Sequence, residues 1–556
     1  FVNAVYPENT KYDYKDGSVF SYHNTVEGYK LLAEKEIDIL DSVCFDNYVK
    51  ENFVINPVIG EYDDPSEQKQ GLLTMPITRG GNVLLYGLAD SGRDEFLQSF
   101  VYSVITNYDS SEANLYLVDF GAETLTNFVD APQVGDVILN SDEEKLNNLV
   151  KMLLGEMNKR KKKFVSYNGN YIDYIKLSGK TVPNIVVVIN VIEIFNDNSL
   201  ELFDKLFPVI RDGAKYGINF VLTTTNQNSV RFKVVQSCKQ LVCLQLANDN
   251  EYRDILGKTN GVIPSKYLGR GLIRLDKVCE FQTAFISNDE NKYKIIQETI
   301  KLLNSKGIKK AQRVPMMPDI IKLDTFNDYY SGIDSVPLGI TKENLKYSLY
   351  DFSRNVVNLI SSNEIRNTKR FMRNYLKILE MDNTFGKIVI DAGNYFEEFN
   401  YNIKYVNSEF DKFIDTLKIV DDKIQEILKQ NNMNVRALKD VANNLCVIVG
   451  FEKFYNKLDE EHKKIFKEIL SNNKEVLKIN FVLIDVPSSF KKYEYEEWYK
   501  NNFDTDDGIW IGIGVTQQFV IKLLVQNAKI SSIDNDYAII VRNGMPEIIK
   551  LINEFK

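Results

Sequence analysis

The chain has 556 residues, a formal net charge of −9 and 44% hydrophobic residues. This length exceeds one ordinary domain, and the balanced composition excludes disordered and fibrous proteins. The acidic charge argues against a generally basic nucleic-acid surface, because phosphate contacts need clustered lysine and arginine. The two histidines, His23 and His462, exclude a multi-histidine metal centre. Five cysteines without a CxxC pair indicate reduced thiols in a cytosolic compartment.

Residues 1–60 precede the first predicted sheet and contain one predicted helix, at Leu31–Tyr48. We expect this segment to be a linker and the remnant of a preceding domain. No apolar run in the sequence approaches the roughly 20 residues that span a bilayer. Because the chain begins at Phe1 without a signal peptide, we expect a soluble piece of a longer protein, with room for a membrane anchor upstream.

Short apolar, β-branched runs alternate with longer helical patterns in residues 61–290. Strands of a parallel sheet are buried on both faces and are therefore continuously apolar. The predicted strands are Val83–Tyr86, Leu115–Val118, Ile185–Asn190, Phe220–Thr223 and Leu241–Leu246. Helical periodicity at Glu143–Phe164 and Leu200–Tyr216 separates them. The pattern predicts an α/β module with a mainly parallel sheet flanked by helices.

An internal repeat predicts a second module of the same kind at residues 319–556. Three segments recur in the same order: Leu117–Gly121 as Val389–Gly393, Asn140–Asp142 as Asn407–Glu409, and Ile218–Leu222 as Ile479–Leu483. The last pair is identical in sequence. Predicted strands follow at Val356–Ile360, Lys387–Ile390, Leu445–Val449, Ile479–Ile484 and Ile509–Ile513. Residues 291–318 are predicted as a linker helix and loop between the modules.

The first predicted strand leads into a loop that matches the glycine spacing of the phosphate-binding motif G-x-x-x-x-G-K-[ST]. Gly87, Ser91 and Gly92 fit it, but Arg93 stands at the lysine position and Asp94 at the Mg²⁺-binding hydroxyl. Two interpretations stay open: a weakened nucleotide pocket that still takes ATP and Mg²⁺, or a vestigial strand–helix connection.

The strand that should supply the carboxylates for Mg²⁺ and water ends instead in Asn190. Glu193 lies two positions too far along to replace them, so hydrolysis is not expected. Polar residues at Thr223–Gln227 are either sensor residues or simply the polar end of a strand. No catalytic residue and no metal ligand is predicted.

The corresponding loop of the second module has lost both glycines and the lysine. We regard Ser361, Arg366, Asn367 and Thr368 as its vestige. The strand at Leu445–Val449 also lacks a terminal carboxylate. No cofactor is therefore expected in the second module, and a scaffold or protein-binding role is favoured.

Two further features carry alternatives. The basic run Lys159–Lys163 is typical of a solvated helix end, with phosphate or membrane-surface contact as the second interpretation. Trp510 lies in a glycine-spaced apolar stretch, which favours a buried strand over the lining of a peptide pocket.

The two modules together resemble tandem FtsK/SpoIIIE-type P-loop domains of the RecA class. Their arrangement is similar to that in the C-terminal half of the EssC/EccC coupling ATPases of type VII (ESX) secretion, in the form found in Firmicutes. The resemblance covers nearly the whole chain and depends on the order of its motifs. The motifs are Pro57–Gly60, Asp63–Pro65, Gln68–Gly71, Gly87–Asp94, Glu156–Met157 with Arg160, Arg211–Gly213, Tyr216–Ile218, Gly269–Gly271 and Val336–Gly339.

The resemblance implies the second and third ATPase modules of a membrane-anchored protein that forms a hexamer and works with other secretion components. It implies small helical WXG-type secretion substrates and a cytoplasmic location for this part. We expect these modules to recruit substrates and regulate the motor. The alternatives are an active ATPase using Arg93 with Asp94 or Glu193, and a DNA translocase, which the acidic charge disfavours.

Overall fold

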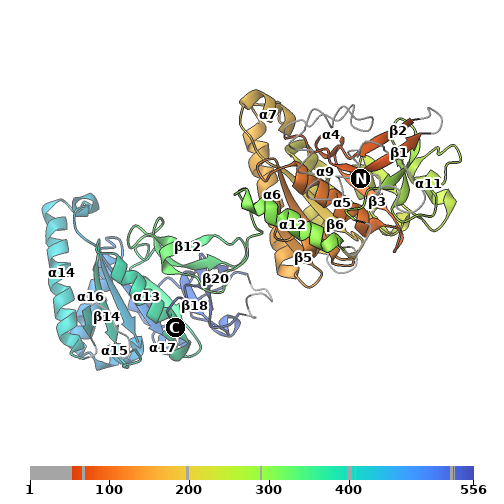
Figure 1. Ribbon diagram of the computed structural model, residues 1–556. Helices are drawn as coiled ribbons and strands as arrows, with labels where there is room; N and C mark the ends of the chain where they lie inside the picture. The colour runs from red at the N-terminus through yellow and green to blue at the C-terminus, as the bar shows by residue number, and fades with distance from the viewer. Residues whose placement is uncertain are drawn as a thin grey trace. The chain divides into compact units, whose positions relative to one another are not determined.

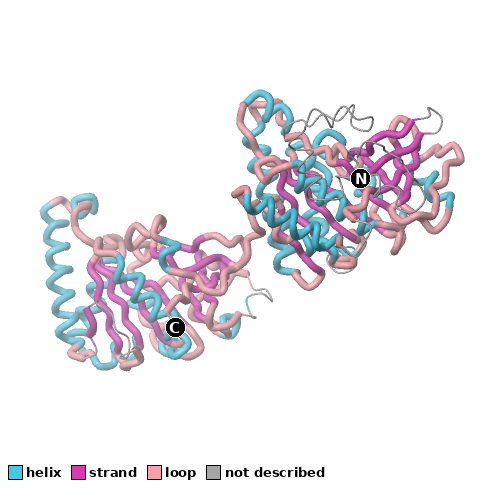
Figure 2. The backbone as a smooth tube through the Cα atoms, viewed as in Figure 1, coloured by secondary structure: helices cyan, strands magenta, loops and turns pink. Residues whose placement is uncertain are grey.

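The computed structural model describes residues 53–555, apart from 65–68, 196–199, 288–290, 397–403, 407, 526–529 and 531–532. The predicted helix Leu31–Tyr48 and His23 lie outside the described residues. The chain divides into two compact units, Phe1–Met316 and Met317–Lys556. Each unit has its own sheet with helices packed on it (Figures 1 and 2).

The sheet of the first unit places its ten described strands in the order β2-β1-β10-β9-β8-β3-β7-β6-β4-β5. The strands are β1 (Val58–Asp64), β2 (Lys69–Thr74), β3 (Val83–Tyr86), β4 (Ala113–Asp119), β5 (Val134–Leu139), β6 (Asn184–Asn190), β7 (Ile218–Thr224), β8 (Gln240–Cys243), β9 (Arg270–Arg274) and β10 (Val278–Thr283). The pairs from β8 to β5 are parallel. This confirms the predicted α/β fold with a parallel core.

An antiparallel wing, which the sequence analysis did not anticipate, extends the parallel strands. It consists of β9, β10, β1 and β2, joined to the core through the β8–β9 pair. Antiparallel neighbours need only short hairpin connections, so this wing lacks the helices that mark βαβ units in the sequence. The sheet is consequently mixed, with β1 beginning at Val58 inside the segment expected to precede the sheet.

Helices cover both faces of the first sheet. They are α4 (Ile77–Gly80), α5 (Arg93–Asn107), α6 (Glu143–Phe164), α7 (Tyr171–Ser178), α9 (Leu200–Asp212), α10 (Phe232–Ser237), α11 (Asp249–Leu256) and α12 (Lys292–Ser305), with short 3₁₀ turns η2 (Thr124–Phe128), η3 (Gly213–Tyr216) and η4 (Gln227–Ser229). Alternate residues of β3 face opposite sides: Val83 and Leu85 join the core that contains α5 and α12, and Leu84 and Tyr86 the core that contains α6 and α9.

The helix predicted between the modules, α12, is packed against the first unit. Its buried residues Ile296, Ile300 and Leu303 belong to the same core as α5. The Tyr102 hydroxyl lies 2.9 Å from the Thr299 hydroxyl, which ties α12 to α5. The helix therefore completes one face of the first sheet, because its apolar stripe is needed there to bury α5.

The second unit repeats the strand order of the first, as β12-β11-β20-β19-β18-β13-β17-β16-β14-β15. Its strands are β11 (Val336–Thr341), β12 (Tyr347–Tyr350), β13 (Val357–Ser361), β14 (Gly386–Asp391), β15 (Lys404–Val406), β16 (Asn444–Val449), β17 (Ile479–Asp485), β18 (Gly508–Ile511), β19 (Tyr537–Arg542) and β20 (Met545–Leu551). Its helices are α13 (Lys369–Met381), α14 (Phe410–Gln430), α15 (Phe451–Lys457), α16 (Glu460–Asn473), α17 (Pro487–Lys491) and α18 (Glu497–Asn502), with η5 (Leu323–Phe326), η6 (Ile365–Thr368), η7 (Val435–Leu438) and η8 (Val515–Gln517).

The shared strand order confirms the repeat found in the sequence. The identical pentapeptides begin β7 and β17, which hold the same place in the two sheets. Asp119 and Asp391 end the equivalent strands β4 and β14, and both are fully buried. Each carboxylate accepts backbone N–H bonds from the turn that follows, Asp119 from Gly121 and Asp391 from Gly393. These two pairs of recurring segments are thus structural equivalents, whereas the third pair, Asn140–Asp142 and Asn407–Glu409, includes a residue outside the described part of the chain.

The basic run Lys159–Lys163 ends helix α6 and is not uniformly solvated. Its four lysines are exposed, but Arg160 is buried. The Arg160 guanidinium pairs with Glu156 at 2.9 Å and donates to the carbonyls of Tyr216, Gly217 and Pro183 at 2.8–3.1 Å. Arg160 therefore fastens α6 to the loops before β6 and β7.

Replacing Arg160 tests this role. We expect Arg160→Ala to lower the free energy of unfolding of the first unit by about 3 kcal/mol, because it leaves buried carbonyls and Glu156 without a partner. Hydrogen exchange in β6 and β7 measures the loss. Fluorescence of Trp498 and Trp510, both in the second unit, gives an internal reference. The matched control, Lys159→Ala on an exposed side chain, is expected to change the same free energy by less than about 0.5 kcal/mol, and an equal effect of both variants would contradict the assignment.

Candidate functional site

The loop between β3 and α5 lies at the carboxyl edge of the parallel strands, where open α/β sheets bind ligands. The Gly87 N–H donates to the carbonyl of Thr224 at the end of β7, and the Leu88 N–H donates to the carbonyl of Gln245. Gly92 has φ of 94°, in the left-handed region that favours glycine. A β-carbon there would lie 2.3 Å from the backbone nitrogen of Gly269, which itself donates to Ser91. The loop is therefore closely held on two sides.

Arg93, at the lysine position of the motif, turns back onto this loop. Its Nη1 lies 3.4 Å from the carbonyl oxygen of Gly87. Among the described residues, the Arg93 Nε and the Ser91 hydroxyl are buried atoms that have no hydrogen-bond partner. A cation and a hydroxyl with unused bonding capacity, set beside a glycine loop, suit a phosphate group.

The next two positions of interest, Asp94 and Asn190, are in direct contact. The Asn190 amide nitrogen donates to Asp94 at 2.9 Å and to Asp119 at 2.9 Å. The Asn190 oxygen accepts from the Thr223 hydroxyl at 2.8 Å. The adjacent β4, β6 and β7 thus each contribute one residue to a network that also holds the first turn of α5.

Hydrogen-bond donors fix the direction in which the Asn190 amide points. The backbone N–H of Val191 donates to the Thr223 hydroxyl oxygen at 2.9 Å, so the hydroxyl proton is left for the Asn190 oxygen. The amide N–H₂ then faces the two carboxylates and satisfies both. A Mg²⁺ ion between Asp94 and Asp119 would meet these N–H donors, so the residues present do not fit a metal held at this position.

Glu193, the other acid near the loop, is engaged elsewhere. One of its carboxylate oxygens accepts from the backbone N–H and the hydroxyl of Thr225, at 2.8 and 2.7 Å. The polar end of β7 therefore binds Glu193 and Asn190, and Asn226 caps the turn η4 through its own side chain. Asp94 and Glu193, the two carboxylates that could support an unconventional hydrolysis, each have one oxygen bonded within the protein, while the second oxygen of Glu193 is buried without a hydrogen-bond partner among the described residues.

At the place of the predicted vestigial loop, between β13 and α13, the second unit has a short 3₁₀ turn, η6. The Ser361 hydroxyl donates to the carbonyl of Asp485 at 2.8 Å, and the buried Thr368 hydroxyl donates to the carbonyl of Ile365 at 2.6 Å. Arg366 is exposed, and Asn367 lies 3.5 Å from the amide of Asn535. Of these four predicted positions, only Thr368 bonds within its own turn, whereas Ser361 bonds to the end of β17 and Asn367 lies against Asn535. The hydrogen bonds of the described residues do not join the four positions into one site.

Sequence reasoning missed three polar residues at these two edges. Asp119 was visible as part of the repeat and Thr223 as part of a polar strand end, but neither was predicted to bind Asn190. Asp485 ends β17 and is buried, which raises the pKa of its carboxyl group. It accepts the backbone N–H groups of Glu452 and Val486, at 2.9 and 2.8 Å, so it too is occupied by the protein.

The first unit also matches a known protein family. Residues 59–260 match the family model of the FtsK/SpoIIIE family. The chain therefore contains an FtsK/SpoIIIE domain, and that domain spans most of the first sheet.

More particularly, its relatives are secretion proteins. The chain is 24% identical over 407 residues to the type VII secretion system protein EssC of Staphylococcus aureus, covering 71% of this chain and 27% of the relative. It is 23% identical over 299 residues to the ESX secretion system protein EccC of Geobacillus thermodenitrificans, covering 52% of this chain and 20% of the relative. The chain thus spans about a quarter of the length of the S. aureus relatives.

Two solved structures share the fold across both units. ATPases 2 and 3 of EssC from Geobacillus thermodenitrificans superpose with a TM-score of 0.74 at 18% identity, covering 91% of this chain and 98% of that one. ATPases 2 and 3 of Thermomonospora curvata EccC, solved with a signal sequence peptide, superpose with a TM-score of 0.59 at 18% identity, covering 92% and 95%. Within the described part of the chain, no helix combines the length and apolar character needed to cross a membrane.

Restoring an acid at position 190 tests the network. We expect Asn190→Asp to lower the free energy of unfolding of the first unit by about 3 kcal/mol at neutral pH, because it removes the shared donor and adds a third carboxylate. Crowded carboxylates raise one another's pKa in the folded state, so the folded variant binds more protons than the unfolded chain. The loss should shrink as the pH falls toward about 5.

A second substitution supplies the control. Asp94→Ser in the Asn190→Asp background removes one of the three acids and returns the hydroxyl of the motif, so most of the lost stability should return. Hydrogen exchange in β6 and β7 at both pH values measures the effect. A pH-independent loss, or no recovery in the double variant, would show that the carboxylates do not interact as described.

Proposed function

We propose that this chain is a cytosolic part of a membrane-anchored type VII secretion coupling ATPase, in which its two units recruit exported proteins and regulate the motor. The observation that carries the proposal is that both units have a complete sheet, whereas neither has a loop with the usual residues for nucleotide hydrolysis. Asp94 and Asn190 bind each other in the first unit, and η6 replaces the loop in the second. In this proposal, hydrolysis belongs to the remaining length of the protein, which assembles as a hexamer.

The first unit is proposed to bind nucleotide weakly and without hydrolysis. Arg93 and Ser91 supply a cation and a free hydroxyl beside Gly87 and Gly92, which suits a phosphate. The Asn190 amide supplies donors where a metal ligand is needed, so binding should not depend on Mg²⁺. The second unit is proposed to bind no nucleotide.

Substrate binding is proposed for the segment that follows β18 in the second unit. Phe519 and Leu524 are 85% and 75% exposed, and Ile513 is also exposed. Exposed apolar side chains that cluster along one segment are typical of protein-binding sites. Trp510 itself is fully buried, and its ring N–H donates to the carbonyls of Gly512 and Ile513. It therefore holds the beginning of this segment in place.

Internal hydrogen bonds hold this segment in one shape. The side-chain oxygen of Gln518 accepts the backbone N–H groups of Val520 and Ile521 at 2.7 and 2.8 Å. The side-chain amide nitrogen of Gln518 donates to the backbone carbonyl of Ile521. The Leu524 N–H donates to the carbonyl of Gly544 in the β19–β20 turn. Phe519 and Leu524 are therefore presented on a fixed backbone, which lowers the entropic cost of binding an apolar helix face. The peptide-bound T. curvata structure, whose fold covers both units, supports testing a protein substrate first.

Titration of ATP with and without Mg²⁺ tests the nucleotide proposal. We expect weak binding of one ATP, unchanged by Mg²⁺ and without phosphate release. Arg93→Ala should weaken ATP binding at least about tenfold, because the substitution removes the only positively charged side chain of the described loop. Arg366→Ala, at the equivalent loop of the second unit, is the matched control and should change nothing. Turnover abolished by Arg93→Ala would instead establish an active ATPase.

Capture of purified WXG-type helical proteins tests the substrate proposal. Phe519→Ser with Leu524→Ser should weaken binding by at least about thirtyfold, because even one central apolar anchor contributes about 2 kcal/mol. Leu177→Ser with Phe232→Ser removes two side chains of 64% and 74% exposure from the first unit and should leave binding unchanged. Absence of binding by the unaltered chain, alone or with ATP, would refute recruitment.

A further inference from the structure

A cavity of about 600 Å³ opens at the amino edge of the first sheet, away from the phosphate loop. Asn82 lies directly before β3, Tyr216 before β7 and Lys239 before β8, so the wall is made by residues that precede the parallel strands. The loop Gly87–Asp94 follows β3 at the opposite edge. The volume falls within the range of roughly 300–1,000 Å³ that is typical of small-ligand sites.

The floor of the cavity is rigid because its polar groups are hydrogen-bonded. The Asn82 amide donates to the carbonyls of Ile210 and Ser237 at 2.6 and 3.1 Å, and its oxygen accepts the N–H of Phe220 at 2.9 Å. This single side chain joins the residue before β3 to β7, α9 and α10. A ligand would meet a surface that is already organised.

Thr78 adds a donor to this floor. Its hydroxyl oxygen accepts the N–H of Ile55 at 2.8 Å and the side-chain amide of Asn184 at 3.0 Å. Both lone pairs of the oxygen are thereby used, and neither bond uses the hydroxyl proton. Because Thr78 lines the cavity, we expect this proton to serve an acceptor there, and an anionic oxygen is the strongest acceptor of this kind.

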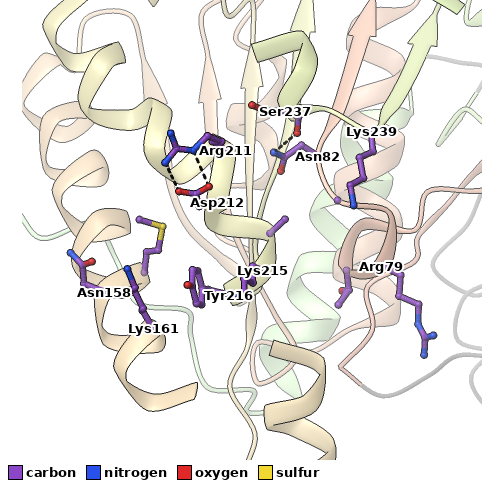
Figure 3. Close-up of a pocket in the computed structure, with 14 residues that line it drawn as sticks. Arg79, Asn82, Asn158, Lys161, Arg211, Asp212, Lys215, Tyr216, Ser237 and Lys239 are labelled. Carbon is purple, nitrogen blue, oxygen red and sulfur yellow. Dashed lines mark hydrogen bonds and ion pairs between the residues drawn. The ribbon is translucent and has the colours of Figure 1, made fainter. Parts of the chain in front are cut away.

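The wall of the cavity is strongly basic. Five of its fourteen lining residues are cationic and one is acidic, a formal charge of +4 on a chain whose net charge is −9. The cationic residues are Arg79, Lys161, Arg211, Lys215 and Lys239. Figure 3 shows Lys161 and Lys239 on two sides of the cavity in this view, with Lys215 and Tyr216 between them. These side chains come from separate elements, so their proximity results from the fold.

The single acid on this described wall, Asp212, does not neutralise the lysines. Arg211 donates to both of its oxygens, at 2.9 and 2.6 Å. The pKa of Asp212 is held below its usual value chiefly by the hydrogen bonds from Arg211, and the charges of Lys161 and Lys215 add to this. Within the described part of the chain, no carboxylate forms an ion pair with Lys161, Lys215 or Lys239. Their positive field is therefore available to a ligand.

We propose that this cavity binds a phosphate-bearing ligand at the amino edge of the first sheet, with Lys161, Lys215 and Lys239 around it and the Thr78 hydroxyl beneath it. Compact oxyanions with more than one negative charge match the fixed donor floor and the small volume better than an extended acidic chain does. The phosphate can come from a soluble ligand or from a lipid headgroup, and both present the same chemistry to the lysines. The site is independent of the loop that holds Arg93.

Titration of the full chain with pyrophosphate, and sedimentation with phosphatidylcholine vesicles with and without phosphatidylglycerol, test the proposal. We expect saturable binding of pyrophosphate or of the anionic vesicles, weakening as salt rises. Lys161→Gln, Lys215→Gln and Lys239→Gln together should reduce it at least about tenfold. The control variant, Lys162→Gln with Lys258→Gln and Lys301→Gln, removes the same charge from exposed lysines outside the cavity and should leave it unchanged. Because the phosphate loop is itself proposed to bind phosphate groups, the cavity and control variants are compared in an Arg93→Ala background, which confines the measured binding to the cavity.

The arms give distinct results. Binding of pyrophosphate that is lost in the cavity variant assigns a soluble ligand, and vesicle binding alone assigns a headgroup. Equal binding by the cavity and control variants, or none by the unaltered chain, would overturn the proposal. Cavity-dependent binding of polyglutamate without either phosphate probe would also overturn it, because the site would then take an acidic peptide.

Discussion

Every residue of β6 and β7 is buried, because helices cover both faces of the sheet at these strands. A polar atom at the end of either strand must consequently find its partner inside the protein, since an unpaired buried group costs about 1–3 kcal/mol. In P-loop motors a metal ion and nucleotide supply part of that pairing. Here the amide of Asn190 supplies it, by bonding Asp94 and Asp119 at once. The buried polar atoms at this strand end are therefore satisfied within the fold.

The same constraint explains which parts of the structure could be predicted from the sequence. Continuously apolar strands are visible in a single chain, so the core of both sheets and the repeat were predictable. The antiparallel wing was not, because its strands carry no intervening helices. The helix α12 has an ordinary amphipathic pattern, which does not reveal which module it covers. Arg160 lies within a run of lysines, and only the three-dimensional positions of Tyr216 and Pro183 distinguish it from its neighbours.

Side-chain networks were the least predictable part. The positions of Asp94 and Asn190 followed from motif spacing, yet their contact depends on the strand order, in which β7 separates β3 from β6. Thr223 gains its role because it lies in that intermediate strand. The second unit shows how far the same topology tolerates change: β17 keeps the pentapeptide of β7, but Asp485 stands at its end and accepts the backbone N–H groups of Glu452 and Val486.

The Asn190 amide bonds two carboxylates at once, and this has a consequence for how the first unit can respond to Mg²⁺. A ligand changes the shape of a protein only to the extent that it binds two conformations with different affinity. A site whose carboxylates and donors already satisfy one another offers no incomplete conformation for Mg²⁺ to complete. The Asp94–Asn190 network is therefore expected to keep one shape whether or not Mg²⁺ is present. Any response of the first unit to nucleotide would have to come from Arg93 and Ser91 instead.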